Sequence, residues 1–80
     1  MEIVYSNNFK KQLKRINYSD AQKILSDVLE LEISPYLGKK LRGRLSDLRK
    51  FRIGNYRVLY KISNEIILLT DVGHRQNIYD

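Results

Sequence analysis

Hydrophobic and polar positions follow two different periods along this chain. After a short alternating segment, Glu2 to Tyr5, the apolar residues Phe9, Leu13 and Ile16 recur at the spacing of one helical stripe. Ser6 precedes them and is a suitable N-cap residue, because its hydroxyl can accept a hydrogen bond from the first turn. The pattern therefore predicts a strand over Glu2–Tyr5 and a helix that runs to about Ile16.

A second helix is predicted between Asn17-Tyr18 and Ser34-Pro35. Ser19 followed three residues later by Gln22 is a capping-box pattern that predicts the start of this helix. The residues of its apolar stripe are Ala21, Ile24, Leu25, Val28 and Leu31. Two amphipathic helices joined by so short a connection are expected to form an antiparallel hairpin that covers another element.

From Leu41 onward the hydrophobic period changes to two. Leu48 to Ile53 and Tyr56 to Ile62 alternate on either side of Gly54-Asn55, a typical two-residue hairpin loop. Ser63-Asn64 predicts a second turn, and Glu65 to Val72 predicts a third, more buried strand. The whole pattern predicts an α+β fold, in which a helical hairpin packs on one face of a mainly antiparallel sheet. The other face stays open to a ligand.

The hairpin loop also predicts which side chains share the open face. With Gly54-Asn55 as the whole loop, Arg52 lies opposite Arg57, and Lys50 shares their face. Like charges directly opposite each other destabilise a sheet, and a bound anion would remove that cost. Independently hydrated cations on a solvated face are the alternative interpretation.

The second predicted turn places the single histidine on this face as well. With Ser63-Asn64 as the loop, Thr70 lies opposite Arg57 and His74 follows on the same side. His74, Arg75 and Tyr79 beside a phosphate would have the groups that acid-base cleavage of a phosphodiester requires. A surface histidine at a strand end is the competing interpretation of His74.

Composition narrows the functional classes. Eighty residues leave room for one domain, over residues 1–80, and a net charge of +6 with a pI near 9.7 favours an anionic partner. The absence of cysteine excludes disulfides, thiolate metal sites and cysteine nucleophiles, and favours a cytoplasmic protein. No apolar run approaches the roughly 20 residues of a membrane span, and no targeting segment is expected.

The acids are scattered, so we expect no metal and no other cofactor. Without a metal, RNA is the better substrate, because its own 2′-OH can attack the phosphate.

Three segments resemble the toxins of the RelE/ParE superfamily. They are residues 38–43, 48–60 and 72–79, which read GKKLRG, LRKFRIGNYRVLY and VGHRQNIY. RelE-like members of type II toxin-antitoxin systems are ribosome-dependent mRNA endonucleases that cut without a metal, through attack of the 2′-OH. The resemblance implies the same fold and an mRNA interferase activity for this chain.

The resemblance also implies roles for the basic strand residues. Lys50 and Arg52 match the positions that contact and activate the scissile region, and Arg57 matches the arginine that holds the phosphate. An arginine at position 52 is a poor proton acceptor because it stays charged, so a general base would have to be His74 or Lys50.

Residues near the C-terminus have matching positions too. Arg75 corresponds to an arginine that stabilises the transition state or assists the leaving group, and Tyr79 to a tyrosine that stacks on or orients the substrate. His74 matches a histidine of one branch of the family and is our candidate for general acid or base, although other branches have a lysine there. Other cations are expected to bind RNA phosphates: Lys39, Lys40, Arg42, Arg44, Arg49 and Lys61.

The resemblance implies several partners. They are a cognate antitoxin, the ribosome with its mRNA, and operator DNA only through the toxin-antitoxin complex; no membrane is expected. Two other functions stay open, a ParE-like inhibitor of DNA gyrase and a non-catalytic basic module that binds RNA or an acidic protein.

Overall fold

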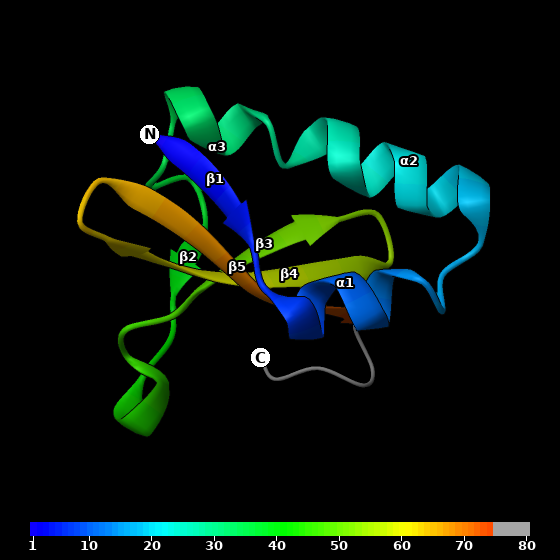
Figure 1. The fold of residues 1–80 in the computed structure, drawn as a ribbon. Helices are drawn as coiled ribbons and strands as arrows, with labels where there is room; N and C mark the ends of the chain where they lie inside the picture. The colour runs from blue at the N-terminus through cyan, green and yellow to red at the C-terminus, as the bar shows by residue number, and fades with distance from the viewer. Residues whose placement is uncertain (75–80) are drawn as a thin grey trace.

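Five strands form a single sheet in the computed structural model, which describes residues 1–74 (Figure 1). The order across the sheet is β1-β5-β4-β3-β2. All neighbours are antiparallel except β1 and β5, which are parallel. The strands are β1 (Glu2–Tyr5), β2 (Lys39–Lys40), β3 (Arg49–Ile53), β4 (Tyr56–Ser63) and β5 (Ile66–His74). The predicted α+β fold with a mainly antiparallel sheet is confirmed.

Three α-helices and one 3₁₀-helix complete the described chain. They are α1 (Asn7–Leu13), α2 (Tyr18–Asp27), α3 (Glu30–Ile33) and the 3₁₀-helix η1 (Gly43–Leu45). In Figure 1, α2 and α3 follow one another along one side of the sheet, and the segment with η1 projects from the opposite side. No helix of the described part of the chain is long and apolar enough to cross a membrane.

The helix boundaries correct three expectations. The first helix, predicted to run to about Ile16, ends at Leu13. Ser6 caps α1 as predicted, with its hydroxyl accepting a hydrogen bond of 3.0 Å from the amide of Phe9. The predicted cap at Ser19 is wrong, because Asn17 has the extended backbone of a cap and its side chain accepts from the amide of Asp20 at 2.9 Å. The second helix is also interrupted after Asp27. There the amide of Leu29 bonds to a carbonyl three residues back rather than four, which tightens the turn and separates α2 from α3.

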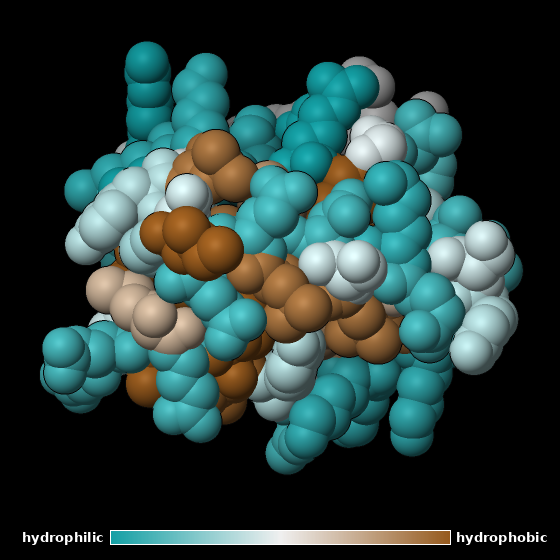
Figure 2. Space-filling view, turned by 90° about the horizontal axis from the view of Figure 1, so that it is seen from above, coloured by the Kyte–Doolittle hydropathy of each residue, from teal (hydrophilic) through white to brown (hydrophobic). Residues whose placement is uncertain are grey.

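The core lies between the helices and one face of the sheet. Phe9 of α1 and Ile24 of α2 are fully buried and pack with sheet residues into one cluster. The other fully or almost fully buried members are Val28, Leu31, Ile53, Val58, Tyr60, Ile67, Leu69 and Val72. Seen from the helix side, brown apolar side chains also gather at the surface between teal polar ones (Figure 2). The exposed large apolar residues around α3 are Leu29, Ile33, Tyr36 and Leu37.

The first hairpin has the predicted loop and register. Gly54 has a φ of +58°, which glycine adopts without strain, and Arg52 lies opposite Arg57. The second loop is one residue later than expected, because Ser63 pairs with Ile66 and leaves Asn64 and Glu65 as the turn. Both turn residues have positive φ, 49° and 64°, as a tight hairpin turn of the mirror-image type requires.

A β-bulge then changes the alternation of β5. Tyr60 pairs with Leu69 and Leu59 with Asp71, so Thr70 is an extra residue between two regular parts of the ladder. The predicted pairing of Thr70 with Arg57 is therefore wrong; Arg57 lies opposite Gly73. Because of the bulge, the side chain of Val72 near the end of β5 lies in the core, where it is only 2% exposed.

Candidate functional site

Basic side chains converge on the sheet face opposite the core. Lys50 and Arg52 alternate along β3 with the partly buried Phe51 and the buried Ile53, and the register brings Arg57 of β4 directly opposite Arg52. Lys39 of the edge strand β2 lies opposite Lys50. We call these four residues, Lys39, Lys50, Arg52 and Arg57, the basic face. The convergence of Lys50, Arg52 and Arg57 predicted from the hairpin is present.

The members of the basic face differ in exposure. Arg52 is exposed, whereas Arg57 is only 8% exposed and is the one buried charged residue of the described chain. Burial first, and the positive charge of Arg57 second, lower the pKa of Lys50 below its usual value. Lys50 therefore becomes neutral more easily than an ordinary lysine and is suited to accept or donate a proton.

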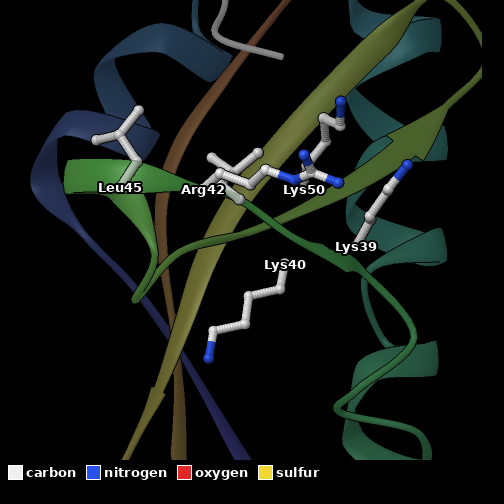
Figure 3. Close-up of a pocket in the computed structure, with 6 residues that line it drawn as sticks. Lys39, Lys40, Arg42, Leu45 and Lys50 are labelled. Carbon is white, nitrogen blue, oxygen red and sulfur yellow. The ribbon is translucent and has the colours of Figure 1, made fainter.

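A pocket of about 260 Å³ adjoins this face at the sheet edge. Gly43 has a φ of +67°, which lets the chain turn after β2 into η1 so that both segments border the pocket. Its lining residues are Lys39, Lys40, Leu41, Arg42, Leu45 and Lys50. Figure 3 shows the charged ends of Lys39, Arg42 and Lys50 extending to one side, and that of Lys40 extending away from them. Four cations thus line the pocket, and three of them have their charged ends on the same side.

Two predicted RNA contacts lie apart from this group. Lys40 pairs with Arg49, and this pair is adjacent to the pair of Lys39 with Lys50. Because side chains alternate along a strand, Lys40 and Arg49 are directed to the other side of the sheet. The guanidinium of Arg49 donates a hydrogen bond of 2.8 Å to the carbonyl of Gly38 and lies 4.9 Å from the ring centroid of Tyr36. These contacts are internal to the fold, so Arg49 stabilises the loop before β2.

The remaining two predicted phosphate contacts are more peripheral. Arg44 is exposed on η1, and Lys61 lies on β4 opposite Leu68 of β5. The pair of Lys61 with Leu68 is the second pair from the bulge toward the Asn64-Glu65 turn, so Lys61 lies away from the Gly54-Asn55 loop. Neither residue lines the pocket beside Lys50.

The hydroxyl of Tyr60 makes two hydrogen bonds that the sequence pattern does not predict. It donates a hydrogen bond of 2.7 Å to the carbonyl of Pro35 and accepts one of 2.9 Å from the amide of Gly38. The residue itself is fully buried, which raises the pKa of Tyr60 above its usual value. Since Gly38 precedes Lys39, this anchor fixes where β2 starts and where Lys39 lies.

His74 is placed differently from the sequence-based expectation. It lies opposite Tyr56 at the end of β5, on the face that carries α2, and not beside Arg57. The hydroxyl of Tyr56 donates a hydrogen bond of 2.8 Å to the carboxylate of Asp20. This bond is the main cause that lowers the pKa of Asp20 and raises the pKa of Tyr56. The predicted orientation of His74 is wrong because the bulge at Thr70 reverses the alternation.

The two remaining candidates, Arg75 and Tyr79, lie outside the described residues. Near the end of β5, within the described residues, Asp71 accepts hydrogen bonds from Asn8 at 2.7 Å and from Gln12 at 3.3 Å. Gln12 also accepts from the amide of Val72 at 2.7 Å, which attaches α1 to the bulged strand. Within residues 1–74, no three His, Cys, Asp or Glu side chains gather into a possible metal site.

Comparison with known proteins adds independent observations. The family model described as the ParE toxin of the type II toxin-antitoxin system, parDE, matches residues 3–79. Toxin RelE3 of Methanocaldococcus jannaschii is 28% identical over 86 residues, covering 100% of this chain and 97% of that protein.

Solved structures share the fold. The toxin-antitoxin complex RelBE2 of Mycobacterium tuberculosis has a TM-score of 0.85 at 24% identity, covering 92% of this chain and 96% of that chain. The RelB-RelE complex of Methanococcus jannaschii has a TM-score of 0.75 at 27% identity, covering 96% and 95% respectively. The isolated RelE toxin of E. coli has a TM-score of 0.76 at 20% identity, covering 91% and 82%. Because the family model spans nearly all of the sequence, the chain belongs to the ParE toxin family of type II toxin-antitoxin systems, within the RelE/ParE superfamily.

Proposed function

We propose that this toxin is a ribosome-dependent endoribonuclease that cleaves mRNA through attack of the 2′-OH, without a metal ion. The observation that carries the proposal is the position of Lys50 on one sheet face with the facing pair Arg52 and Arg57. A lysine with a lowered pKa beside two permanent cations combines a proton carrier with donors for phosphate oxygens.

The chemistry requires one bond to form and one to break. The 2′-oxygen attacks the neighbouring phosphorus, its proton goes to a base, and the 5′-oxygen of the next nucleotide leaves with a proton from an acid. The products are a 2′,3′-cyclic phosphate and a 5′-hydroxyl. Neutral Lys50 is our candidate base, and Arg52 and Arg57 would stabilise the charge on the phosphoryl oxygens.

The C-terminal residues complete this proposal. By the family resemblance, Arg75 would assist the leaving oxygen and Tyr79 would orient the substrate. We favour Lys50 over His74 as the proton acceptor, since the ring of His74 lies against Tyr56 on the helix side of the sheet.

The proposal includes a cognate antitoxin as a partner. Solved complexes that share this fold pair a RelE toxin with a RelB antitoxin, as in Methanococcus jannaschii and Pyrococcus horikoshii. The excess of basic over acidic residues in this chain, a net charge of +6, would favour an antitoxin with an acidic surface. Operator DNA would be bound through the toxin-antitoxin complex, and the ribosome would present the mRNA.

Primer extension in a purified translation system tests the activity. We expect ribosome-dependent cuts that persist when metal is withdrawn from the cleavage step, and their loss in Arg52→Ala. Arg44→Ala is the matched control, because Arg44 is also an exposed arginine but lies outside the basic face. Cleavage that is unchanged in Arg52→Ala would refute the catalytic assignment.

A ParE-like inhibitor of DNA gyrase is the second candidate, because the matching family model is that of the ParE toxins. A supercoiling assay with purified gyrase separates the two functions. Growth arrest with inhibited supercoiling and intact mRNA would favour gyrase as the target. Growth arrest with neither effect would point to a basic module that only binds its partner.

A further inference from the structure

Large apolar side chains are exposed together on the segment that leads from α3 toward β2. We call Leu29, Ile33, Tyr36 and Leu37 the α3 patch; their exposed fractions are 49%, 88%, 64% and 53%. Leu29 and Ile33 lie one helical turn apart on one side of α3, whereas Leu31 on the other side is fully buried in the core. Exposed apolar clusters of this kind mark surfaces that bind another protein.

The charges beside the α3 patch differ between its two halves. The half formed by α3 carries the exposed carboxylates of Glu30 and Glu32. The half that follows contains Tyr36, which lines a pocket of about 270 Å³ together with Lys40 and Arg49. The patch therefore has an acidic half and a basic half.

Each half also contains one charge of the opposite sign. The N-terminal ammonium of Met1 donates a hydrogen bond of 3.2 Å to the carbonyl of Glu32, and Asp47 lines the pocket beside Lys40. One ammonium against two carboxylates leaves the acidic half negative. One carboxylate against two cations leaves the basic half positive, so the two halves remain opposite in sign.

This polarity fits a second copy of the same chain. A twofold dimer uses one surface on both copies, and an antiparallel arrangement places the acidic half of each copy against the basic half of the other. The attraction between opposite charges then occurs twice. An acidic antitoxin segment laid along the whole patch would instead be repelled by Glu30 and Glu32.

The aromatic ring in the patch suits the centre of such an interface. The guanidinium of Arg49 lies 4.9 Å from the ring centroid of Tyr36 and holds a hydrogen bond to the carbonyl of Gly38. The ring is thus supported from one side while 64% of the residue stays exposed. Tyrosine and arginine are enriched among the residues that contribute most to protein interfaces, and a supported ring loses little freedom on binding.

We propose that the α3 patch joins two copies of this toxin in a twofold dimer, with Glu32 of each copy near Lys40 of the other. Lys40 is directed to the side of the sheet opposite Lys39 and Lys50, so the dimer leaves the basic face of each copy uncovered. The inference goes beyond the proposed ribonuclease and does not depend on it. It predicts a toxin with two basic faces, whatever its target.

Sedimentation equilibrium of the full-length chain tests the dimer. Four side chains are a small part of the roughly 800 Å² per partner that a stable interface buries, so the dimer is expected to be weak. Loading from about 1 µM to about 1 mM should show a reversible change from monomer to dimer. Ile33→Ser should weaken dimerisation at least about tenfold, because a twofold interface contains the substitution twice.

Tyr18→Ser is the matched control for the loss of an exposed apolar side chain. Tyr18 is 79% exposed at the start of α2, away from the α3 patch, so its removal should leave dimerisation within about twofold of the wild type. Thermal unfolding of both variants shows whether they fold as the wild type does, which is expected because both residues are exposed.

A charge exchange tests the antiparallel arrangement. Glu32→Lys and Lys40→Glu should each weaken dimerisation, since each places like charges against one another twice. An equal mixture of the two variants should dimerise more tightly than either alone, because both contacts between the different copies again join opposite charges. The two variants shift the net charge of +6 in opposite directions, so a general change in repulsion would give them opposite effects.

Three results would overturn the proposal. A chain that stays monomeric up to about 1 mM would leave the patch to another occupant, such as the antitoxin. Tighter dimerisation of Lys40→Glu than of the wild type would show that net charge alone governs association. A mixture that dimerises no more tightly than its separate components would show that the acidic and basic halves do not face each other.

Discussion

The imidazole of His74 packs edge-on against the ring of Tyr56, with 5.7 Å between the two ring centroids. Tyr56 is in turn bonded to Asp20 of α2. The histidine thus belongs to a group that joins the end of β5 to the helix layer, whereas Lys50 belongs to the basic face. The two candidate proton carriers therefore lie on opposite sides of one sheet.

Substitution of these two residues should affect cleavage unequally. Lys50→Ala is expected to lower the rate of cleavage by about 10²-fold or more, the usual effect of removing a general base. His74→Ala should lower it less than about tenfold, since its ring contacts Tyr56. Single-turnover cleavage on programmed ribosomes measures both rates. The reverse ranking would assign the proton transfer to His74.

The pH dependence of the rate should reflect Lys50. Only the neutral amine accepts a proton, so the rate is expected to rise with pH until the lowered pKa of Lys50 is passed and then to level off. Lys50→Arg keeps the charge but does not titrate in this range, so its residual rate should lack that rise. A rise that persists in Lys50→Arg would show that another group titrates.

Loss of the Tyr60 hydroxyl should loosen the loop before β2. Tyr60→Phe leaves the buried amide of Gly38 and the carbonyl of Pro35 without this partner, at an expected cost of about 1–3 kcal/mol. Urea denaturation measures the change in unfolding free energy. Tyr18→Phe is the control, because Tyr18 is 79% exposed and loss of its hydroxyl should change the unfolding free energy by less than about 0.5 kcal/mol.

Gly38→Ala tests the same anchor by crowding it. A Cβ at this position would lie 2.6 Å from the ring and from the hydroxyl of Tyr60, closer than real contacts allow. We expect a loss of about 1–3 kcal/mol and a larger KM for mRNA, because the start of β2 and Lys39 would shift. A stability and a KM equal to those of the wild type would show that the loop accommodates the methyl group without moving β2.

The bond between Tyr56 and Asp20 should make stability depend on pH. Since this bond lowers the pKa of Asp20, its contribution is complete above the ordinary value of 3.8 and is lost as the pH falls through the lowered pKa. The pKa of Tyr56 is raised above 10.0, so at alkaline pH the contribution is lost as the pH rises through that raised value. The stability difference between the wild type and Tyr56→Phe should thus be largest near neutral pH. Urea denaturation across the pH range measures it, and a constant difference would contradict this account.

Much of the fold follows from local sequence signals. Gly54-Asn55 fixes the register of the first hairpin because a two-residue loop permits one pairing, and that pairing assembles Arg52 and Arg57. The second turn is less easily predicted, since Glu65 adopts a positive φ, which glutamate seldom does. The neighbouring serine is an equally good turn residue, so sequence alone does not choose between the two positions.

The rest depends on contacts between distant residues. Nothing local distinguishes Thr70 as an extra residue; the bulge is stabilised by side chains of α1, such as Asn8, which donates to the carbonyl of Thr70 at 3.1 Å. The orientation of His74 depends on that bulge. The pocket likewise depends on η1 and β3 meeting across a turn, which no hydrophobic period predicts.

The extra residue at Thr70 also has a consequence for the evolution of the family. The ladder is regular on both sides of it, from Tyr60 with Leu69 on one side and from Leu59 with Asp71 on the other. Loss of this one codon would leave both sets of pairs intact, whereas loss of a residue elsewhere in β5 would move buried side chains into water. Relatives that differ in the length of this strand should therefore carry their insertions and deletions at the bulge.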